Sequence, residues 1–248
     1  MKNAKLSIIT VTFNAEDSLE ETILSVISQT YKDIEFIIID GMSTDTTLSI
    51  IQKYKDKIAN TISERDGGIY HAMNKGIALS TGDYLYFLNS GDRLYSSDTI
   101  QKVFEICQDD DVIYGKTALI NKDKSLKKIT SIPNNLTHKS FVSGMPVSHQ
   151  SIIIKKSLIE PYDLNYKYVS DQDYIIKALK KAKKIKNSNL IISKYQLGGF
   201  SDNNFFGCWR DKFKIVKKHF GLKELLLNYI LFVREYLKKI VKGILKIV

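Results

Sequence analysis

The chain has 248 residues, of which 44% are hydrophobic and 26% are charged, and this composition excludes general disorder. The length suits one domain, or one domain with an appendage. The two cysteines, Cys107 and Cys208, exclude a disulfide framework and an all-cysteine zinc site, and they fit a reducing, cytoplasmic compartment.

The positive charge is concentrated toward the C-terminal end. Of the net charge of +10, residues 205–248 contribute +8, from 11 Lys and Arg against 3 Asp and Glu, and residues 1–204 contribute +2, from 26 against 24. This distribution predicts a nearly neutral body over residues 1–204 and a basic tail over residues 205–248. No run of 18 apolar residues predicts a transmembrane helix, and no secretory signal is recognisable.

The first half of the chain alternates between strand and helix patterns. Apolar and β-branched runs predict strands at residues 6–12, 34–39, 58–63 and 84–88. Apolar residues at helical spacing predict helices at residues 18–29, 44–54 and 69–79. The second of these helices follows the capping residues Ser43, Thr44 and Asp45, and the third is opened by Gly67-Gly68. The alternation predicts an α/β fold with a mostly parallel sheet flanked by helices.

The second half gives a coarser pattern. Its predicted elements are helices at residues 98–107 and 171–179, strands at 112–120, 151–154 and 190–193, and a loop region at 133–146. Several common motifs are absent from the chain: a dinucleotide-binding G-x-G-x-x-G, a Walker A sequence, a G-x-S-x-G elbow and metalloprotease histidine spacing. What remains is a set of polar residues at the predicted strand ends, where ligands bind in parallel sheets.

Six segments together resemble family 2 glycosyltransferases with the GT-A fold. The segments are SIITVTFN (7–14), SQTY (28–31), IDGMSTDTT (39–47), ERDGGIYHAMNKG (64–76), FLNSGD (87–92) and SDQD (170–173). Their order and spacing carry the resemblance, which extends over about residues 5–200. It implies a GT-A-like catalytic domain over residues 1–204, of the type that builds bacterial surface polysaccharides.

The resemblance also implies a donor site for a nucleotide-diphosphate sugar. The donor-binding candidates are Thr12, Asn14, Asp40, Asp66, Gly67, Lys75, Asn89 and His149. Asp40 is expected to accept a hydrogen bond from the base or ribose, and Lys75 to neutralise phosphate. For four of them a structural role remains open: a turn or cap for the two aspartates, a solvated side chain for Lys75 and a structural hydrogen bond for His149. The segment Gly198–Ser201 is a candidate loop over the donor phosphates.

Asp92 is the candidate metal ligand. It stands where the family has its Asp-x-Asp metal motif, and the implied cofactor is Mg²⁺ or Mn²⁺, which prefer hard oxygen ligands. The family pattern is usually Asp-x-Asp-Asp, whereas Asn89-Ser90-Gly91-Asp92 keeps only the last carboxylate. A weakened metal site is therefore expected, with Asn89 offering a carbonyl oxygen.

Asp171 is the candidate catalytic base, and Asp173 is the second choice. A carboxylate that accepts the proton of an acceptor hydroxyl supplies general-base catalysis, typically about 10²–10⁴-fold. One such base with a departing nucleoside diphosphate implies a single displacement with inversion. Asp173 lies two positions after Asp171, so on a helix its side chain is expected on a different side. Ser170-Asp171 also suits a helix cap, and a cap and a base are compatible.

The basic tail is predicted to form an amphipathic helix after a shorter helix that ends at Gly221. Its apolar stripe follows a 4-3-4-3 spacing through Leu226, Ile230, Val233, Leu237, Ile240, Ile244 and Ile247. Three interpretations are open: packing on the catalytic body, docking on an anionic membrane surface, and a coiled-coil dimer. Nucleic acid is not expected as a partner, because the body is not basic and recognition motifs are absent.

The predicted function is transfer of a hexosyl or N-acetylhexosaminyl group to an acceptor hydroxyl. The implied acceptor is a glycan or lipid-linked oligosaccharide, which would place the enzyme peripherally at the inner face of the cell membrane. Two alternatives remain open. A sugar nucleotidyltransferase usually needs a glycine-rich triphosphate loop, which residues 12–16 do not provide. A non-catalytic membrane or scaffold module is compatible with the reduced metal motif.

Overall fold

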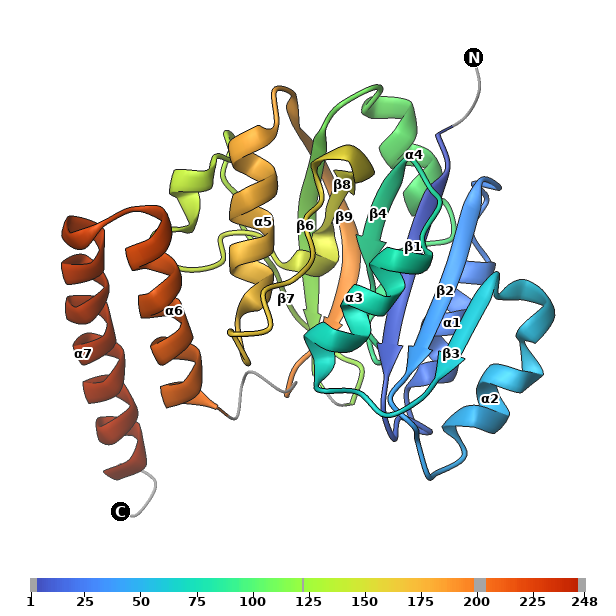
Figure 1. Cartoon of the computed structure of the whole chain (residues 1–248), viewed down its shortest axis with the longest axis horizontal. Helices are drawn as coiled ribbons and strands as arrows, with labels where there is room; N and C mark the ends of the chain where they lie inside the picture. The colour runs from blue at the N-terminus through green and yellow to red at the C-terminus, as the bar shows by residue number, and fades with distance from the viewer. Residues whose placement is uncertain (1–3, 122, 199–203, 245–248) are drawn as a thin grey trace.

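The computed structural model describes residues 4–121, 123–198 and 204–244. One mixed sheet forms the centre of the molecule, with helices on both of its faces and a helical hairpin at one end (Figure 1). The strand order is β3-β2-β1-β4-β8-β6-β9-β5, and β7 pairs with β6. The predicted α/β fold class is confirmed.

The elements have the following bounds. The strands are β1 (Leu6–Thr12), β2 (Ile34–Asp40), β3 (Asn60–Ser63), β4 (Tyr84–Phe87), β5 (Arg93–Leu94), β6 (Val112–Ile120), β7 (Leu126–Ile129), β8 (Ile152–Lys155) and β9 (Ile185–Gln196). The helices are α1 (Leu19–Ile27), α2 (Thr47–Lys53), α3 (Ile69–Leu79), α4 (Thr99–Ile106), α5 (Ser170–Lys181), α6 (Phe205–His219) and α7 (Leu222–Ile244). Short 3₁₀ turns lie at Lys55–Lys57, His138–Phe141, His149–Ser151 and Lys156–Leu158.

The first four strands are all parallel, and their carboxyl ends meet at one edge of the sheet. β1 pairs with β2 and β4, and β2 pairs with β3. In this register Thr12 lies beside Asp40, and Asp40 lies beside Ser63. The loops that follow these strands therefore converge, which is the arrangement that builds ligand sites in parallel sheets.

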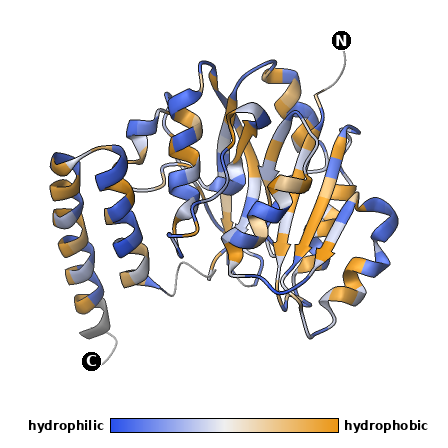
Figure 2. Cartoon of the chain, in the orientation of Figure 1, coloured by the Kyte–Doolittle hydropathy of each residue, from blue (hydrophilic) through white to orange (hydrophobic). Residues whose placement is uncertain are grey.

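Two apolar cores cover the two faces of the sheet. On one face Ile9 and Val11 of β1 pack with α3 and α5, and on the other Leu6 and Ile8 pack with α1, α2 and α4. Figure 2 shows the apolar residues concentrated along β1 and β2, as expected for strands that are buried on both faces. Helix α3 approaches β1 closely, because a Cβ at Gly76 would lie 2.4 Å from Cγ2 of Ile9.

Most predicted elements exist, with three local differences. Helix α2 begins at Thr47, later than predicted, although the carboxylate of Asp45 does accept a hydrogen bond from the Thr47 backbone N–H at 3.0 Å. Strands β5 and β7 were not predicted, since β5 has two residues and every side chain of β7 is exposed. Strand β9 is longer than predicted because its polar first half pairs with β6 despite a register shift.

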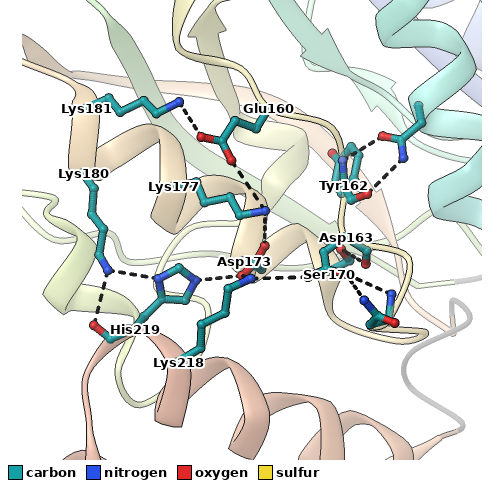
Figure 3. A network of polar contacts seen from close by, with 12 residues as sticks. Glu160, Tyr162, Asp163, Ser170, Asp173, Lys177, Lys180, Lys181, Lys218 and His219 are labelled. Carbon is teal, nitrogen blue, oxygen red and sulfur yellow. Dashed lines mark hydrogen bonds and ion pairs between the residues drawn. The ribbon is translucent and has the colours of Figure 1, made fainter.

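The tail forms two helices, as predicted, and Gly221 separates them with a positive φ of 105°. Figure 1 shows α6 beside the body and α7 on the far side of α6. Helix α6 buries Ile215 and Val216 and is joined to α5 by a network of polar contacts around Asp173 (Figure 3). None of the helices in the described ranges is long and apolar enough to cross a membrane.

Candidate active site

The loops after β1 and β2 are tied to each other at the converging edge of the sheet. Asn14 adopts a left-handed backbone conformation with φ of 46°, which asparagine tolerates better than most residues. Its backbone N–H donates to Oγ of Ser43 at 2.8 Å, and its Oδ1 accepts from the Thr44 N–H at 2.9 Å. Asn14 therefore shapes the rim of the candidate donor site by joining two loops.

Asp40 lies beneath these loops and is fully buried. One carboxylate oxygen accepts from Oγ of Ser43 at 2.5 Å, and the other accepts from Oγ of Ser63 at 2.6 Å and from the Ser43 N–H at 3.0 Å. Both oxygens are thus occupied by the protein itself. The structure brings Asp40 to the predicted edge, where its carboxylate holds the loop. A contact between Asp40 and a base or ribose stays a prediction.

Asp66 and Lys75 lie next to the Asp40 loop. A Cβ at Gly41 would come within 3.4 Å of Oδ2 of Asp66, so this carboxylate borders the loop. Lys75 forms ion pairs with Asp66 at 2.5 Å and with Glu64 at 2.8 Å. Burial acts to lower the pKa of Lys75, but these two carboxylates outweigh it and raise that pKa. The predicted phosphate-neutralising lysine is therefore already paired with two acidic side chains.

Gly67 opens helix α3 and is exposed. Its backbone N–H donates to Nδ1 of His71 at 3.3 Å, and this ring nitrogen also lies 3.3 Å from Oδ1 of Asp66. The glycine pair precedes an eleven-residue helix whose N-terminal N–H groups carry partial positive charge. The Asp66–Gly67 turn thus places an acidic side chain and a backbone without a side chain at one helix end.

A chain of polar contacts joins four side chains from distant parts of the sequence. Nδ1 of His149 lies 3.2 Å from one carboxylate oxygen of Asp171, and the other oxygen accepts from the Gln172 N–H at 3.0 Å. The hydroxyl of Tyr70 lies 3.3 Å from this second oxygen and 3.0 Å from the backbone oxygen of Tyr168, so its one proton is shared between the two. Nε2 of His149 lies 3.3 Å from the side-chain nitrogen of Asn89. Because a carboxylate only accepts and the Asn89 amide nitrogen only donates, the neutral ring carries its proton on Nδ1.

Two oxygens at this edge are buried and have no hydrogen-bond partner among the described residues. They are Oδ1 of Asn89 and Oγ1 of Thr12. Thr12 ends β1, and Asn89 follows the neighbouring strand β4. Buried polar atoms are nearly always paired in folded proteins, so the two unpaired oxygens make these adjacent strand ends a candidate place for a polar ligand.

The surroundings of Asp92 do not suit a side chain that binds a metal ion. It is buried, and its two oxygens accept from Nε2 of Gln150 at 2.9 Å and from the Gln196 N–H at 3.2 Å. Burial raises the pKa of Asp92 to about 7, although the Gln150 hydrogen bond and His149 act to lower it. Within the described ranges no group of three or more His, Cys, Asp or Glu side chains is placed to hold a metal ion. The donor set at this edge therefore fits a divalent cation poorly.

Comparison with known proteins agrees with this arrangement of strand-end loops. Residues 7–159 match the model of the family described as Glycosyl transferase family 2. The chain belongs to this family. A glycosyltransferase of Mycobacterium tuberculosis described as uncharacterised is 34% identical over 183 residues, covering 70% of this chain and 68% of its own. The Escherichia coli UDP-Glc:alpha-D-GlcNAc-diphosphoundecaprenol beta-1,3-glucosyltransferase WfaP is 28% identical, with 81% of each chain covered.

Solved structures with low sequence identity share the fold. Staphylococcus aureus TarS 1–349 in complex with UDP matches with a TM-score of 0.64 at 20% identity, over 87% of this chain and 66% of that one. A mannosyltransferase from Pyrobaculum calidifontis, in complex with GDP-Man and Mn²⁺, matches with a TM-score of 0.59 at 14% identity, over 88% and 64%. This glycosyltransferase thus spans about two thirds of those chains and has the GT-A fold expected from its motifs.

Asp173, the second catalytic candidate of this glycosyltransferase, does not lie with Asp171. Its side chain is fully buried on another side of α5. It contacts Nζ of Lys177 at 2.7 Å, Nε2 of His219 at 2.7 Å and Nζ of Lys218 at 3.1 Å (Figure 3). Burial acts to raise the pKa of Asp173, but these three partners outweigh it and lower that pKa. Asp173 therefore fastens α6 to α5 and has no open oxygen toward the Asp171 group.

Two members of the site were not among the predicted residues. Tyr70 follows the Asp66-Gly67-Gly68 turn, and its position on the first turn of α3 points its hydroxyl at Asp171 across 101 positions of sequence. Gln150 follows His149, and its side-chain amide donates a hydrogen bond to Asp92. Both lie inside or next to quoted motifs, which is the only sequence signal for them. The predicted phosphate loop at Gly198–Ser201 lies, apart from Gly198, outside the described residues.

Proposed function

We propose that this glycosyltransferase moves a hexosyl or N-acetylhexosaminyl group from a nucleotide-diphosphate sugar to an acceptor hydroxyl, with Asp171 as the base. The observation that carries the proposal is the environment of Asp171. Its carboxylate is held from two sides by His149 and Tyr70, beside the unpaired oxygen of Asn89. Membership of the family favours this function over the nucleotidyltransferase and the non-catalytic module.

In the proposed reaction, Asp171 accepts the proton of the acceptor hydroxyl as its oxygen attacks the anomeric carbon. The new carbon–oxygen bond forms while the bond to the diphosphate breaks, and the electron pair leaves with the diphosphate. One displacement on the face opposite the leaving group inverts the anomeric configuration. Burial and the Asp171 charge raise the pKa of Tyr70 well above 10, so its hydroxyl keeps the proton that it shares between Asp171 and the backbone oxygen of Tyr168.

The proposed donor site lies along the ends of β1, β2 and β4. Thr12 and Asn89 offer the unpaired oxygens, and Asn14, Asp66 and Gly67 border the loops. Asp40 and Lys75 support this edge through their own partners rather than by direct contact. The names of relatives favour a uridine nucleotide as donor, since WfaP uses UDP-Glc and TarS has been solved with UDP and with UDP-GlcNAc.

Mg²⁺ or Mn²⁺ as cofactor stays a prediction from the family resemblance. The nearest support is the Mn²⁺ in the solved mannosyltransferase complex. A bound divalent cation would neutralise charge on the departing diphosphate. Because both oxygens of Asp92 already accept hydrogen bonds, the proposed mechanism assigns Asp92 no metal and routes no step through one.

The proposed acceptor is a lipid-linked glycan of a cell-surface polysaccharide, used at the inner face of the cell membrane. The E. coli relative supports this acceptor class, because its name specifies a sugar on diphosphoundecaprenol. A lipid-linked acceptor remains in the membrane, so an enzyme that uses it must work at the membrane surface. The exact acceptor sugar is set by pocket shape.

Two matched substitutions on α5 test the proposed base. Asp171→Asn keeps the side-chain volume but removes the base, so release of nucleoside diphosphate should fall about 10²–10⁴-fold while nucleotide binding persists. Asp173→Asn, two residues along the same helix, should lower the melting temperature and leave turnover of the folded enzyme within a few-fold. Rates measured below the melting transition of both variants would refute the proposal if Asp171→Asn kept its activity or Asp173→Asn lost it.

A further inference from the structure

The predicted apolar stripe of the tail faces away from the rest of the molecule. Five of its side chains lie on α7 with large exposed fractions: Leu226 63%, Ile230 61%, Val233 51%, Leu237 55% and Ile240 40%. The side chains of Ile244 and Ile247 lie outside those that the structure describes. Figure 2 shows apolar positions recurring along α7 at the edge of the molecule. Contiguous exposed apolar surface of this kind marks an interaction site.

The opposite side of α7 is the side that packs on the protein. Asn228 is buried there and donates to the backbone oxygen of Val142 at 3.0 Å. Phe232 contacts the rings of Trp209 and Phe213 from α6, with centroids 5.5 and 5.7 Å apart. The inner face is thus already occupied. Packing on the catalytic body, one of the three predicted uses of the stripe, is therefore excluded for these five side chains.

An aromatic groove between α6 and α7 adjoins the stripe. It has a volume of about 390 Å³ and is lined by aromatic side chains that include Phe206, Phe213 and Tyr229. Phe206 is 63% exposed, and Tyr229 lies one residue before Ile230 of the stripe. Aromatic side chains of this type are enriched at the headgroup level of bilayers. The stripe and the groove together form one apolar face on the helical hairpin.

Cationic side chains border this face on both helices. Lys223 and Arg234 fall beside the stripe at the 100° per residue of an α-helix, and Arg210 and Lys214 line the groove on α6. Glu235 pairs with Arg234 at 3.2 Å and with Lys238 at 2.8 Å, which offsets part of this charge. The segment 205–248 still carries +8. An apolar face bordered by cations is complementary to an anionic lipid surface.

We propose that the apolar face of α6 and α7 docks on the surface of an anionic bilayer, with α7 lying in the interface plane. The 23 residues of α7 give a helix about 35 Å long, enough for all five exposed stripe residues to enter the interface together. A second copy of the chain is the weaker occupant, because it would bring two tails of +8 together. The inference is independent of the chemistry proposed for Asp171.

Vesicle flotation with the full chain tests the inference. We expect binding to vesicles with 30% phosphatidylglycerol, little binding to pure phosphatidylcholine vesicles, and release as salt is raised. Leu226→Glu with Leu237→Glu should weaken binding at least tenfold, and so should Lys214→Glu with Lys223→Glu. The matched controls lie on β7, where Leu126 is 59% exposed: Leu126→Glu, and Lys127→Glu with Lys128→Glu, should bind as the unmodified protein does.

Three results would overturn the inference. The first is equal binding to the two kinds of vesicle, or no binding at low salt. The second is a loss of binding in the β7 controls as large as that in the stripe variants. The third is a dimer in sedimentation velocity without vesicles that Leu226→Glu with Leu237→Glu converts to monomer, which would make the stripe a contact between copies. Circular dichroism of each variant separates lost binding from lost folding.

Discussion

The proton on Nδ1 of His149 gives this residue a defined task beside Asp171. Its ring donates toward one carboxylate oxygen, and its other nitrogen is held by the side-chain amide of Asn89. One oxygen lies toward His149, and the other accepts from the Gln172 N–H and lies near the Tyr70 hydroxyl, so the carboxylate can rotate little. His149 is therefore a positioning residue in the proposed mechanism, because it acts through Asp171 rather than on the reacting atoms.

A double-mutant cycle tests this role of His149. We expect His149→Ala to lower turnover about tenfold in the otherwise unmodified enzyme, because the base loses its orientation. In an Asp171→Asn background the same change should have almost no further effect, since residues that act as a unit are not additive. Nucleoside diphosphate release gives the four rates. Equal effects of His149→Ala in both backgrounds would show that His149 acts independently of Asp171.

Three residues of the candidate site were expected together from the sequence, whereas Tyr70, Gln150 and the internal partners of the other candidates were not. Asn89, His149 and Asp171 were expected in one site, and the structure joins them in one chain of contacts. Asp40 and Lys75 were expected to face the donor. Their charges are instead taken up by nearby serines and carboxylates, because hydroxyl and acidic side chains on neighbouring loops reach them first. The spacing of the motifs does not show which neighbouring side chains pair with Asp40 and Lys75.

At the scale of elements, Glu35 connects two strands and a loop. It lies on β2, and its buried carboxylate accepts from Oγ of Ser7 on β1 at 2.5 Å and from the Thr81 N–H after α3 at 2.7 Å. Nζ of Lys5 pairs with it at 2.9 Å. Burial acts to raise the pKa of Glu35, but these donors outweigh it and lower that pKa to about 2.

Glu35 makes the stability of the sheet pH-dependent in one direction. A carboxylate with a lowered folded-state pKa stabilises above its unfolded value of 4.5 and loses this effect as pH falls toward about 2. We expect Glu35→Gln to reduce the free energy of unfolding by about 2–3 kcal/mol at pH 7 and by much less at pH 3. Urea denaturation at both pH values measures this. Glu105→Gln, on the exposed surface of α4, is the control, and an equal loss at both pH values would contradict the prediction.

The order of the elements was predictable because each early strand and helix has its own periodic pattern. The remaining elements depend on contacts between segments that are distant in the sequence. Strand β7 has four exposed residues, Leu126–Ile129, and exists because β6 offers it an edge. The amphipathic pattern of α7 predicted the helix, but it did not predict which way the apolar stripe would face. The stripe faces outward because aromatic side chains of α6 pack on the other face of α7. An apolar stripe in a sequence indicates that something covers it. The pattern does not show whether the cover is another part of the same chain or a separate molecule.

At the scale of the whole molecule, α6 links the catalytic body to the outer helix α7. Asp173 on α5 contacts Lys218 and His219 at the end of α6 (Figure 3). Asp211 of α6 accepts from the Tyr168 N–H at 2.9 Å. Asp173 and Asp211 are both fully buried. The first helix of the predicted tail is therefore held to the body by buried carboxylates, and α7 is the part that extends outward. The boundary at residue 204 stays a prediction.

Removing the charge of Asp173 should loosen α6 and α7 together while the sheet stays folded. The lowered pKa of Asp173 means that its stabilisation is present above the unfolded value of 3.8 and is lost only in strong acid, so the effect should be full at pH 7. We expect Asp173→Asn to cost about 3 kcal/mol, because Lys177, Lys218 and His219 lose a buried anionic partner. Hydrogen exchange should then rise over residues 205–244.

The control is Asp163→Asn, because Asp163 contacts Lys218 from a partly exposed position at 3.3 Å. Its removal leaves the Asp173 contacts in place, so exchange in α6 should stay close to that of the unmodified protein. If Asp173→Asn accelerated exchange equally in β1 and β2, the carboxylate would stabilise the whole domain rather than the attachment of the hairpin. If neither variant changed exchange in α6, burial of Ile215 and Val216 together with the Asp211 hydrogen bond would hold this helix.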